Sequence, residues 1–265
     1  MQAALPLALV TNDDGIDSPF LHVLVRALSD RFRVVVAAPK GEQSWIGRAM
    51  SRRRDVHVEK HPVEGVEGWT IDGTPTDCVN IAIGHLLKER PSIVVSGINI
   101  GFNTSMPLLL SSGTLVGAIE GAHWGLPAIA ASQSLPSEVF DQLQADRERI
   151  PEALQHVLEA SAWHVSEAAA VVVEEGQPGL IVHNLNYPPS MRKETEIQKT
   201  LPSHVSLGSL YASDDGETYR FTFQGGTVNP ETDRTDRSAL NDGFASWTRL
   251  NFSKLGESLD IEHSL

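Results

Sequence analysis

The sequence has a single cysteine, Cys78, among its 265 residues. One cysteine excludes an internal disulfide and any metal site built from several thiolates. No run of apolar residues approaches the roughly 18 that cross a bilayer, so we expect no membrane-spanning segment and no membrane partner. The first six residues lack the basic start and the apolar core of a signal peptide, so we expect a cytoplasmic protein.

Basic residues are also scarce. The 21 Lys and Arg stand against 34 Asp and Glu, which gives a formal net charge of −13. Most of the acidic excess lies after residue 130, where 21 acidic residues accompany 10 basic ones. A protein that binds long nucleic acids needs cations to displace counterions from the phosphates. We therefore expect no long nucleic acid as a partner, whereas the nearly neutral first half can still hold a small anion.

The motifs of several large enzyme classes are missing. The sequence has no Gly-x-x-x-x-Gly-Lys-Ser/Thr phosphate loop, no Gly-x-Gly-x-x-Gly and no His-Glu-x-x-His. It also lacks the Gly-x-Ser-x-Gly turn of the α/β-hydrolases. Any active site must therefore be built from other residues.

Short apolar runs alternate with helical patterns over residues 1–189. The runs predict strands over 7–10, 33–39, 91–95, 127–131 and 180–182, and the helical patterns cover 20–28, 114–124 and 138–175. This alternation predicts an α/β fold with a parallel sheet and helices on its faces. Residues 190–265 are rich in turn residues and hold one alternating stretch, 218–223, which predicts a β-rich C-terminal extension that is not an independent domain.

Three polar loops follow apolar strands, over residues 12–14, 41–47 and 96–114. If the strands are parallel, the loops lie at one edge of the sheet, where sites form in such folds. The adjacent carboxylates of Asp13 and Asp14 repel each other, and a divalent cation with hard oxygen ligands would offset that repulsion. The alternative is a plain turn, because Asn-Asp-Asp-Gly is also good turn chemistry.

Ser112, Gly113 and Thr114 precede an expected helix and offer hydroxyls and backbone N–H groups at its positive end. This arrangement suits a phosphate, but it is equally the arrangement of an ordinary N-cap. Asn99 and Asn103 flank Gly101 and are either ligands or turn residues. The residues alone leave these alternatives open.

Taken together, the loops resemble the SurE family, the stationary-phase survival proteins that act as metal-dependent nucleotidases. The segments that carry the resemblance are, in chain order, VTNDDGI (10–16), AP (38–39) with QS (43–44), DGTPTDCV (72–79), VSGINIG (95–101), SGT (112–114) and EGAHWGLP (120–127). A weaker match lies at Thr235, Asp236, Ala239 and Gly243. The order and spacing of the pieces are specific, although no piece is specific alone.

The resemblance implies a phosphomonoesterase that acts on nucleoside 5′- and 3′-monophosphates, with a Rossmann-like three-layer α/β/α core. It implies one divalent cation per subunit, Mn²⁺ or Mg²⁺, held by Asp13, Asp14, Ser44 and Asn99. Of these, Asp13, Asp14 and Asn99 would be catalytic. The residues expected near the phosphate are Asn12, Asn103, Ser112, Gly113 and Thr114. The C-terminal extension would build a homodimer or a homotetramer by exchange of elements.

The segment between Asn103 and Ser112 departs from the family pattern. It is one residue longer and lacks the usual Gly, Asp and Tyr. The departure keeps open a nucleotide-binding regulator with little or no turnover. An aspartyl-phosphate phosphatase with Asp13 as nucleophile is a further alternative, although its second carboxylate usually lies two residues on. Trp45 stands where many family members have a small residue, and it is either a stacking surface for a nucleobase or a packed loop anchor.

Overall fold

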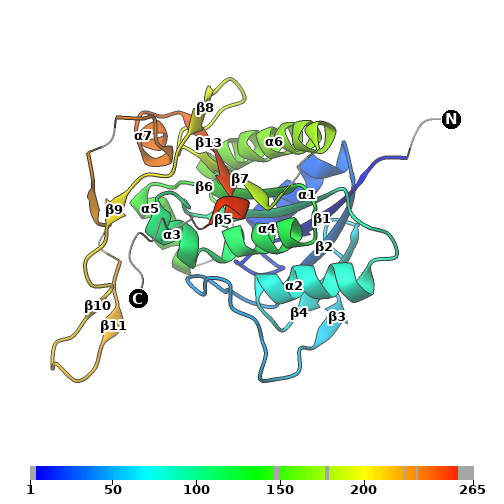
Figure 1. Cartoon of the computed structure of the whole chain (residues 1–265), viewed down its shortest axis with the longest axis horizontal. Coiled ribbons are helices and arrows are strands. Elements are labelled where there is room, and N and C mark those ends of the chain that lie inside the picture. The colour runs from blue at the N-terminus through cyan, green and yellow to red at the C-terminus, as the bar shows by residue number, and fades with distance from the viewer. Residues whose placement is uncertain (1–3, 146–149, 177–178, 224, 231, 256–265) are drawn as a thin grey trace, which may run out of the picture.

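Figure 1 shows the computed structural model of the chain, which describes residues 4–145, 150–176, 179–223, 225–230 and 232–255. Within these residues a nine-stranded sheet has the order β3-β4-β2-β1-β5-β6-β7-β13-β8. Its strands are β1 (Leu7–Thr11), β2 (Arg33–Pro39), β3 (Val58–Lys60), β4 (Glu67–Ile71), β5 (Ile93–Ile100), β6 (Ala128–Gln133), β7 (Ile181–Tyr187), β8 (Ile197–Thr200) and β13 (Ala245–Asn251). The sheet is mixed but mostly parallel.

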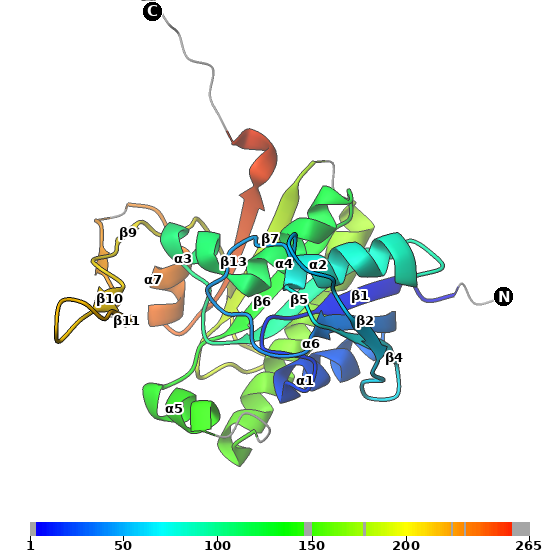
Figure 2. The same cartoon turned by 90° about the horizontal axis from the view of Figure 1, so that it is seen from below.

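Helices cover both faces of this sheet. Helices α1 (Pro19–Ser29) and α6 (Glu152–Glu175) pack on one face, and α2 (Pro75–Ile81) and α4 (Gly113–His123) pack on the other, as Figures 1 and 2 show. The shorter elements are η1 (Ala82–Leu86), α3 (Met106–Ser111), α5 (Ser137–Ala145), α7 (Asp236–Asn241) and η2 (Phe252–Lys254). The arrangement confirms the expected α/β fold with three layers.

The register of the central strands places their carboxyl ends together. Strand β1 lies between β2 and β5 and runs parallel to both. Val10 pairs with Val36, and Thr11 pairs with Ser96, so the three strands end at the same edge of the sheet. All five residues of β1 are buried, as the apolar run predicts.

Two segments differ from the sequence prediction. The single helix expected over 138–175 is divided, because α5 ends at Ala145 and α6 begins at Glu152. Pro151 stands just before α6, where a proline favours a helix start and prevents a helix from running through. The alternating stretch 218–223 contributes only β11 (Arg220–Phe221), which pairs with β10 (Tyr211–Ala212).

The C-terminal residues complete the sheet. Strand β13 lies between β7, to which it is antiparallel, and β8, to which it is parallel. Strand β9 (Val205–Ser206) pairs with β12 (Thr227–Val228), and the β10–β11 hairpin projects from one end of the molecule in both views. None of the helices in the described ranges combines the length and the apolar character needed to span a bilayer.

Candidate active site

The loops after β1, β2 and β5 meet at one edge of the sheet and line a cavity of about 740 Å³. This confirms the convergence expected from parallel strands. Seven of the nine residues expected to bind the metal or the phosphate lie on its wall: Asp13, Asp14, Ser44, Asn99, Asn103, Ser112 and Gly113. The other two, Asn12 and Thr114, are fully buried behind it.

The two adjacent carboxylates are held differently. Asp13 is 3% exposed, and its Oδ1 accepts a hydrogen bond from Thr114 Oγ1 at 2.7 Å. Its carbonyl oxygen accepts from the backbone of Gln43 at 2.7 Å. Burial raises the pKa of the Asp13 carboxyl to about 6, although the bond from Thr114 acts the other way. Asp14 is less buried, and its Oδ2 accepts from the Ile100 N–H at 3.1 Å, which ties it to the end of β5.

Two neutral oxygen donors face the same cavity. Asn99 is nearly buried, and its Nδ2 donates to the carbonyl of Gly101 at 3.0 Å. This bond fixes the orientation of the Asn99 amide, so its Oδ1 lies on the side away from the Gly101 carbonyl. The hydroxyl of Ser44 donates to Glu42 Oε1 at 2.7 Å, so its lone pairs are the part that can bind a cation. Both side chains are thus oriented by partners of their own loops.

The first turn of α4 closes the cavity beside Asp13. Ser112 is the N-cap, and its Oγ accepts from the Leu115 N–H at 3.0 Å, which bears out the N-cap alternative for this residue. A Cβ built on Gly113 would lie 2.7 Å from Asp13 Cβ and 2.6 Å from the carbonyl oxygen of Gln43. Only glycine fits there. Because α4 begins at Gly113, which lines the cavity, the positive end of the helix dipole lies at the cavity wall.

A chain of buried hydrogen bonds runs behind Asp13. Asn103 Nδ2 donates to Thr114 Oγ1 at 3.2 Å and to Ser132 Oγ at 2.9 Å, and Thr114 donates in turn to Asp13. The hydroxyl of Thr114 therefore holds the carboxylate of Asp13. Asn12 Nδ2 donates to the carbonyl three residues on, at 2.8 Å, which is the turn role weighed for this loop.

Three residues that support the site escaped the sequence analysis in this role. Asn184 and Asn186 of β7 donate to the carbonyl of Asn103 at 2.9 and 3.0 Å, and Asn186 Oδ1 accepts from the Asn103 N–H at 2.8 Å. Asp236 of α7 accepts from the Ser105 N–H at 2.9 Å and is fully buried. The available signal for Asn184 and Asn186 was their spacing of two residues within a short strand, which places both side chains on one face.

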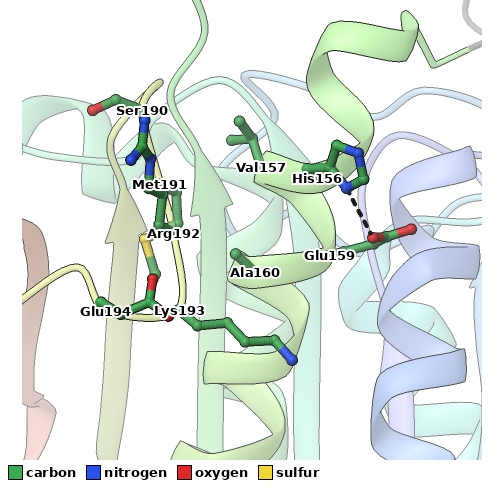
Figure 3. Close-up of a pocket in the computed structure, with 9 residues that line it drawn as sticks. All are labelled: His156, Val157, Glu159, Ala160, Ser190, Met191, Arg192, Lys193 and Glu194. Carbon is green, nitrogen blue, oxygen red and sulfur yellow. Dashed lines mark ion pairs between the residues drawn. The ribbon is translucent and has the colours of Figure 1, made fainter.

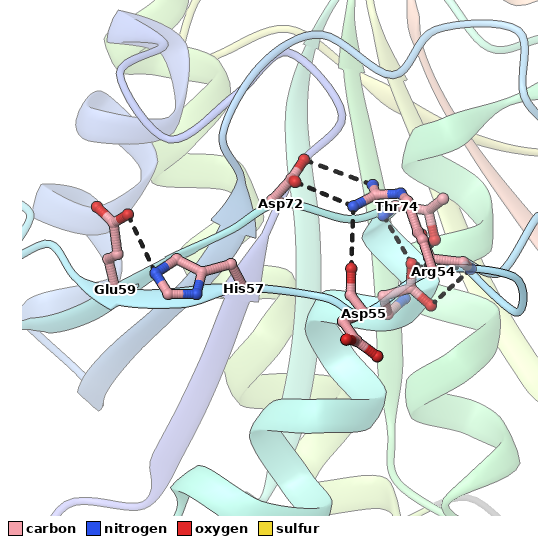
Figure 4. A network of polar contacts seen from close by, with 8 residues as sticks. Arg54, Asp55, His57, Glu59, Asp72 and Thr74 are labelled. Carbon is pink, nitrogen blue, oxygen red and sulfur yellow. Dashed lines mark hydrogen bonds and ion pairs between the residues drawn. The ribbon is translucent and has the colours of Figure 1, made fainter.

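The loop that carries Ser44 is anchored along its length. Arg48 forms an ion pair of 2.6 Å with Glu120 of α4, whose side chain is 4% exposed, and Asn80 of α2 donates to the same carboxylate at 2.8 Å. Further on, Arg54 pairs with Asp72 at 2.9 Å (Figure 4), but both side chains are exposed, and such pairs contribute little. The Glu120 contacts are therefore the stronger anchor.

A second cavity, of about 400 Å³, lies between α6 and residues 190–194. Figure 3 shows that its wall mixes charges of both signs, with Arg192, Lys193 and Glu194 on one side and the His156–Glu159 pair on α6. None of the residues singled out from the sequence lines it. It carries neither the paired carboxylates nor the helix start of the first cavity.

The donor set of the first cavity fits a hard cation. In the part of the chain that the structure describes, no group of three or more His, Cys, Asp or Glu is placed to hold a metal. Among the residues that line the cavity, Asp13, Asp14, Ser44 and Asn99 offer two carboxylates, a hydroxyl and an amide oxygen. Mg²⁺ and Mn²⁺ prefer such oxygens. A cation would also offset the cost of a buried carboxylate at Asp13.

Comparisons with known proteins point to a single family. The family model described as Survival protein SurE matches residues 8–207. A 5′-nucleotidase SurE of Methanosarcina acetivorans is 33% identical over 270 residues, which cover 96% of this chain and 98% of the relative. A 5′-nucleotidase SurE of Methanothrix thermoacetophila is 36% identical over 263 residues, covering 96% and 97%.

Among solved structures, the SurE protein of Aquifex aeolicus superposes with a TM-score of 0.73 at 27% identity, covering 93% of both chains. The likeness therefore extends over nearly the whole of both chains. With a family model that matches most of the chain and relatives above 30% identity over nearly its whole length, this protein belongs to the SurE family.

Proposed function

We propose that this protein is a metal-dependent phosphomonoesterase that releases phosphate from nucleoside 5′- and 3′-monophosphates. One observation carries the proposal. Four residues with oxygen ligands, which come from the carboxyl ends of β1 and β5 and from the loop after β2, converge on one cavity beside Gly113 at the start of α4. The printed name of the curated relatives, 5′-nucleotidase, supports the 5′ activity.

The roles of the side chains follow from their places on the cavity wall. Asp13, Asp14, Ser44 and Asn99 would hold one divalent cation, Mn²⁺ or Mg²⁺. When bound, such a cation supplies positive charge beside the phosphoryl oxygens and lowers the pKa of water. The N–H of Gly113, at the positive end of α4, orients the phosphate and stabilises the negative charge that develops on it.

In the proposed reaction a water oxygen forms the new bond to phosphorus while the ester P–O bond breaks. The products are inorganic phosphate and the nucleoside, whose leaving oxygen takes up a proton. Asp13 is not needed as a nucleophile, and its place supports this assignment: it is 3% exposed and already held by Thr114. Its carboxylate is positioned to bind a cation more readily than to approach phosphorus.

The test is phosphate release from 5′-AMP and 3′-AMP after removal of metal with EDTA, with and without added Mn²⁺ or Mg²⁺. We expect release to depend on the added cation and to be poor with phosphodiesters, for whose second ester group the cavity holds no dedicated residues. An EDTA-treated enzyme as fast as the metal-loaded one would overturn the mechanism. Nucleotide binding without any turnover would favour the regulatory alternative.

A further inference from the structure

Aromatic side chains gather on one wall of the active-site cavity. The indole of Trp45 contacts two rings of the C-terminal segment, Phe221 at 4.9 Å and Phe223 at 5.5 Å between ring centroids. All three rings line the cavity, together with Phe102 and Phe140. We refer to Trp45, Phe221 and Phe223 as the aromatic wall.

The aromatic wall joins segments that lie far apart in the sequence, and Trp45 has an unusual backbone conformation. Trp45 has a φ of 60°, in the left-handed region that a bulky side chain rarely adopts. It directly follows Ser44, so the Cα atoms of the two residues are about 3.8 Å apart. The loop conformation thus places an indole beside a proposed cation ligand, and residues 221–223 return from the C-terminal hairpin to meet it.

The rings are packed but not buried. Trp45 is 40% exposed, Phe221 is 44% exposed and Phe223 is 39% exposed, although each contacts another ring. A loop anchor that served packing alone would bury more of this apolar surface, because each exposed ring forfeits part of its hydrophobic stabilisation. The exposed ring surface therefore remains available to a ligand in the cavity.

The cavity is also larger than a phosphate requires. Its volume of about 740 Å³ is in the range of pockets that enclose whole small molecules. One end offers carboxylates and a helix start, and another wall offers flat apolar rings. These two chemistries match the two ends of a nucleotide, the charged phosphate and the flat base.

We propose that the aromatic wall binds the nucleobase of the substrate by stacking, and so selects nucleoside monophosphates over phosphomonoesters that lack a base. The inference rests on the proposed phosphatase function and names the group that its substrate must carry. Stacking is tolerant of base identity, because every base has a π-face. The wall therefore predicts broad use of nucleotides, with purines moderately ahead of pyrimidines.

The experiment compares kcat/KM for 5′-AMP with kcat/KM for ribose 5-phosphate, which has the same phosphate ester but no base. Trp45→Leu and Phe223→Leu remove a ring but keep an apolar side chain, and Trp45→Phe keeps a ring. Tyr219→Leu is the matched control, because Tyr219 projects from the same hairpin, is 61% exposed and does not line the cavity. Circular dichroism checks that each variant folds.

We expect the preference for AMP over ribose 5-phosphate to fall at least about 10-fold in both leucine variants, through KM for AMP, in line with the usual strength of base–aromatic stacking. Trp45→Phe should retain most of the preference, and Tyr219→Leu should retain all of it. Because Phe223 is not part of the loop that carries Ser44, its variant tests the wall while the sequence of that loop stays unchanged.

The outcomes separate the two proposals. If both leucine variants keep the wild-type preference, or lose activity equally on both substrates, the aromatic wall has no role in base binding while the phosphatase function stands. If the wild-type enzyme with Mn²⁺ releases phosphate from neither substrate, the proposed function fails and the inference fails with it.

Discussion

Replacing Asp13 by Asn should have opposite effects on the stability and on the activity of the protein. The side chain is 3% exposed, and burial raises its pKa from the usual 3.8 to about 6. In the metal-free protein the folded state therefore binds this proton more tightly than the unfolded state does. The ionised carboxylate costs stability above pH 6, and the cost disappears as the pH falls toward 4. The difference between the two pKa values corresponds to ~3 kcal/mol at most.

Asparagine has nearly the same shape, and its Oδ1 can still accept the hydrogen bond from Thr114. We therefore expect Asp13→Asn in EDTA at pH 8 to be at least as stable as the wild type, and up to ~3 kcal/mol more stable. The advantage should shrink as the pH falls to about 4. Urea unfolding at several pH values, followed by far-UV circular dichroism, measures this difference.

Activity should move in the opposite direction. The variant removes one negative charge from the proposed cation site, so phosphate release from AMP should fall at least about 100-fold. Asp17→Asn is the control, since Asp17 lies just beyond the same loop but is exposed, and it should change stability by less than ~1 kcal/mol. A variant that loses several kcal/mol in EDTA, with activity reduced only as far as its folded fraction, would refute this reasoning.

Three further predictions follow from contacts around the site. Gly113→Ala should lower both stability and activity, because the alanine Cβ would lie 2.7 Å from Asp13. Gly41→Ala, where a Cβ meets open space, is the control and should change neither by much. Thermal melts and phosphate-release assays measure the two effects. Glu120→Gln should cost ~1–3 kcal/mol in urea unfolding and weaken Mn²⁺ binding measured by calorimetry, because Arg48 loses its buried partner. Light scattering should give at least twice the chain mass of 28.8 kDa, because the C-terminal segment exposes apolar side chains outside the active-site cavity, such as Leu201 and Val228, to a second copy; a monomer mass at micromolar concentration would contradict this.

Local patterns predicted the parts of the site that follow directly from a strand end. The apolar runs before Asp13 and Asn99 located β1 and β5, and parallel pairing then brought their loops together. The sequence pattern does not reveal β3, β4 or α2, because these elements are short and lack a sustained period. The hydrogen bonds that link Asn103 through Thr114 to Asp13 could not be predicted either, since contacts between distant residues leave no periodic pattern in the sequence.

The place of β13 in the sheet has a consequence for how the chain is made. Strand β7 leaves the ribosome before β13, because residues 188–244 lie between them, yet all seven of its residues are buried in the finished protein. Until β13 is synthesised, β7 presents a row of unpaired N–H and C=O groups along its free edge, which is a template for pairing with other nascent chains. Closure over so long a separation is slow. Strand β13 thus protects the edge of β7. A chain that ends before β13 should depend on chaperones to avoid aggregation.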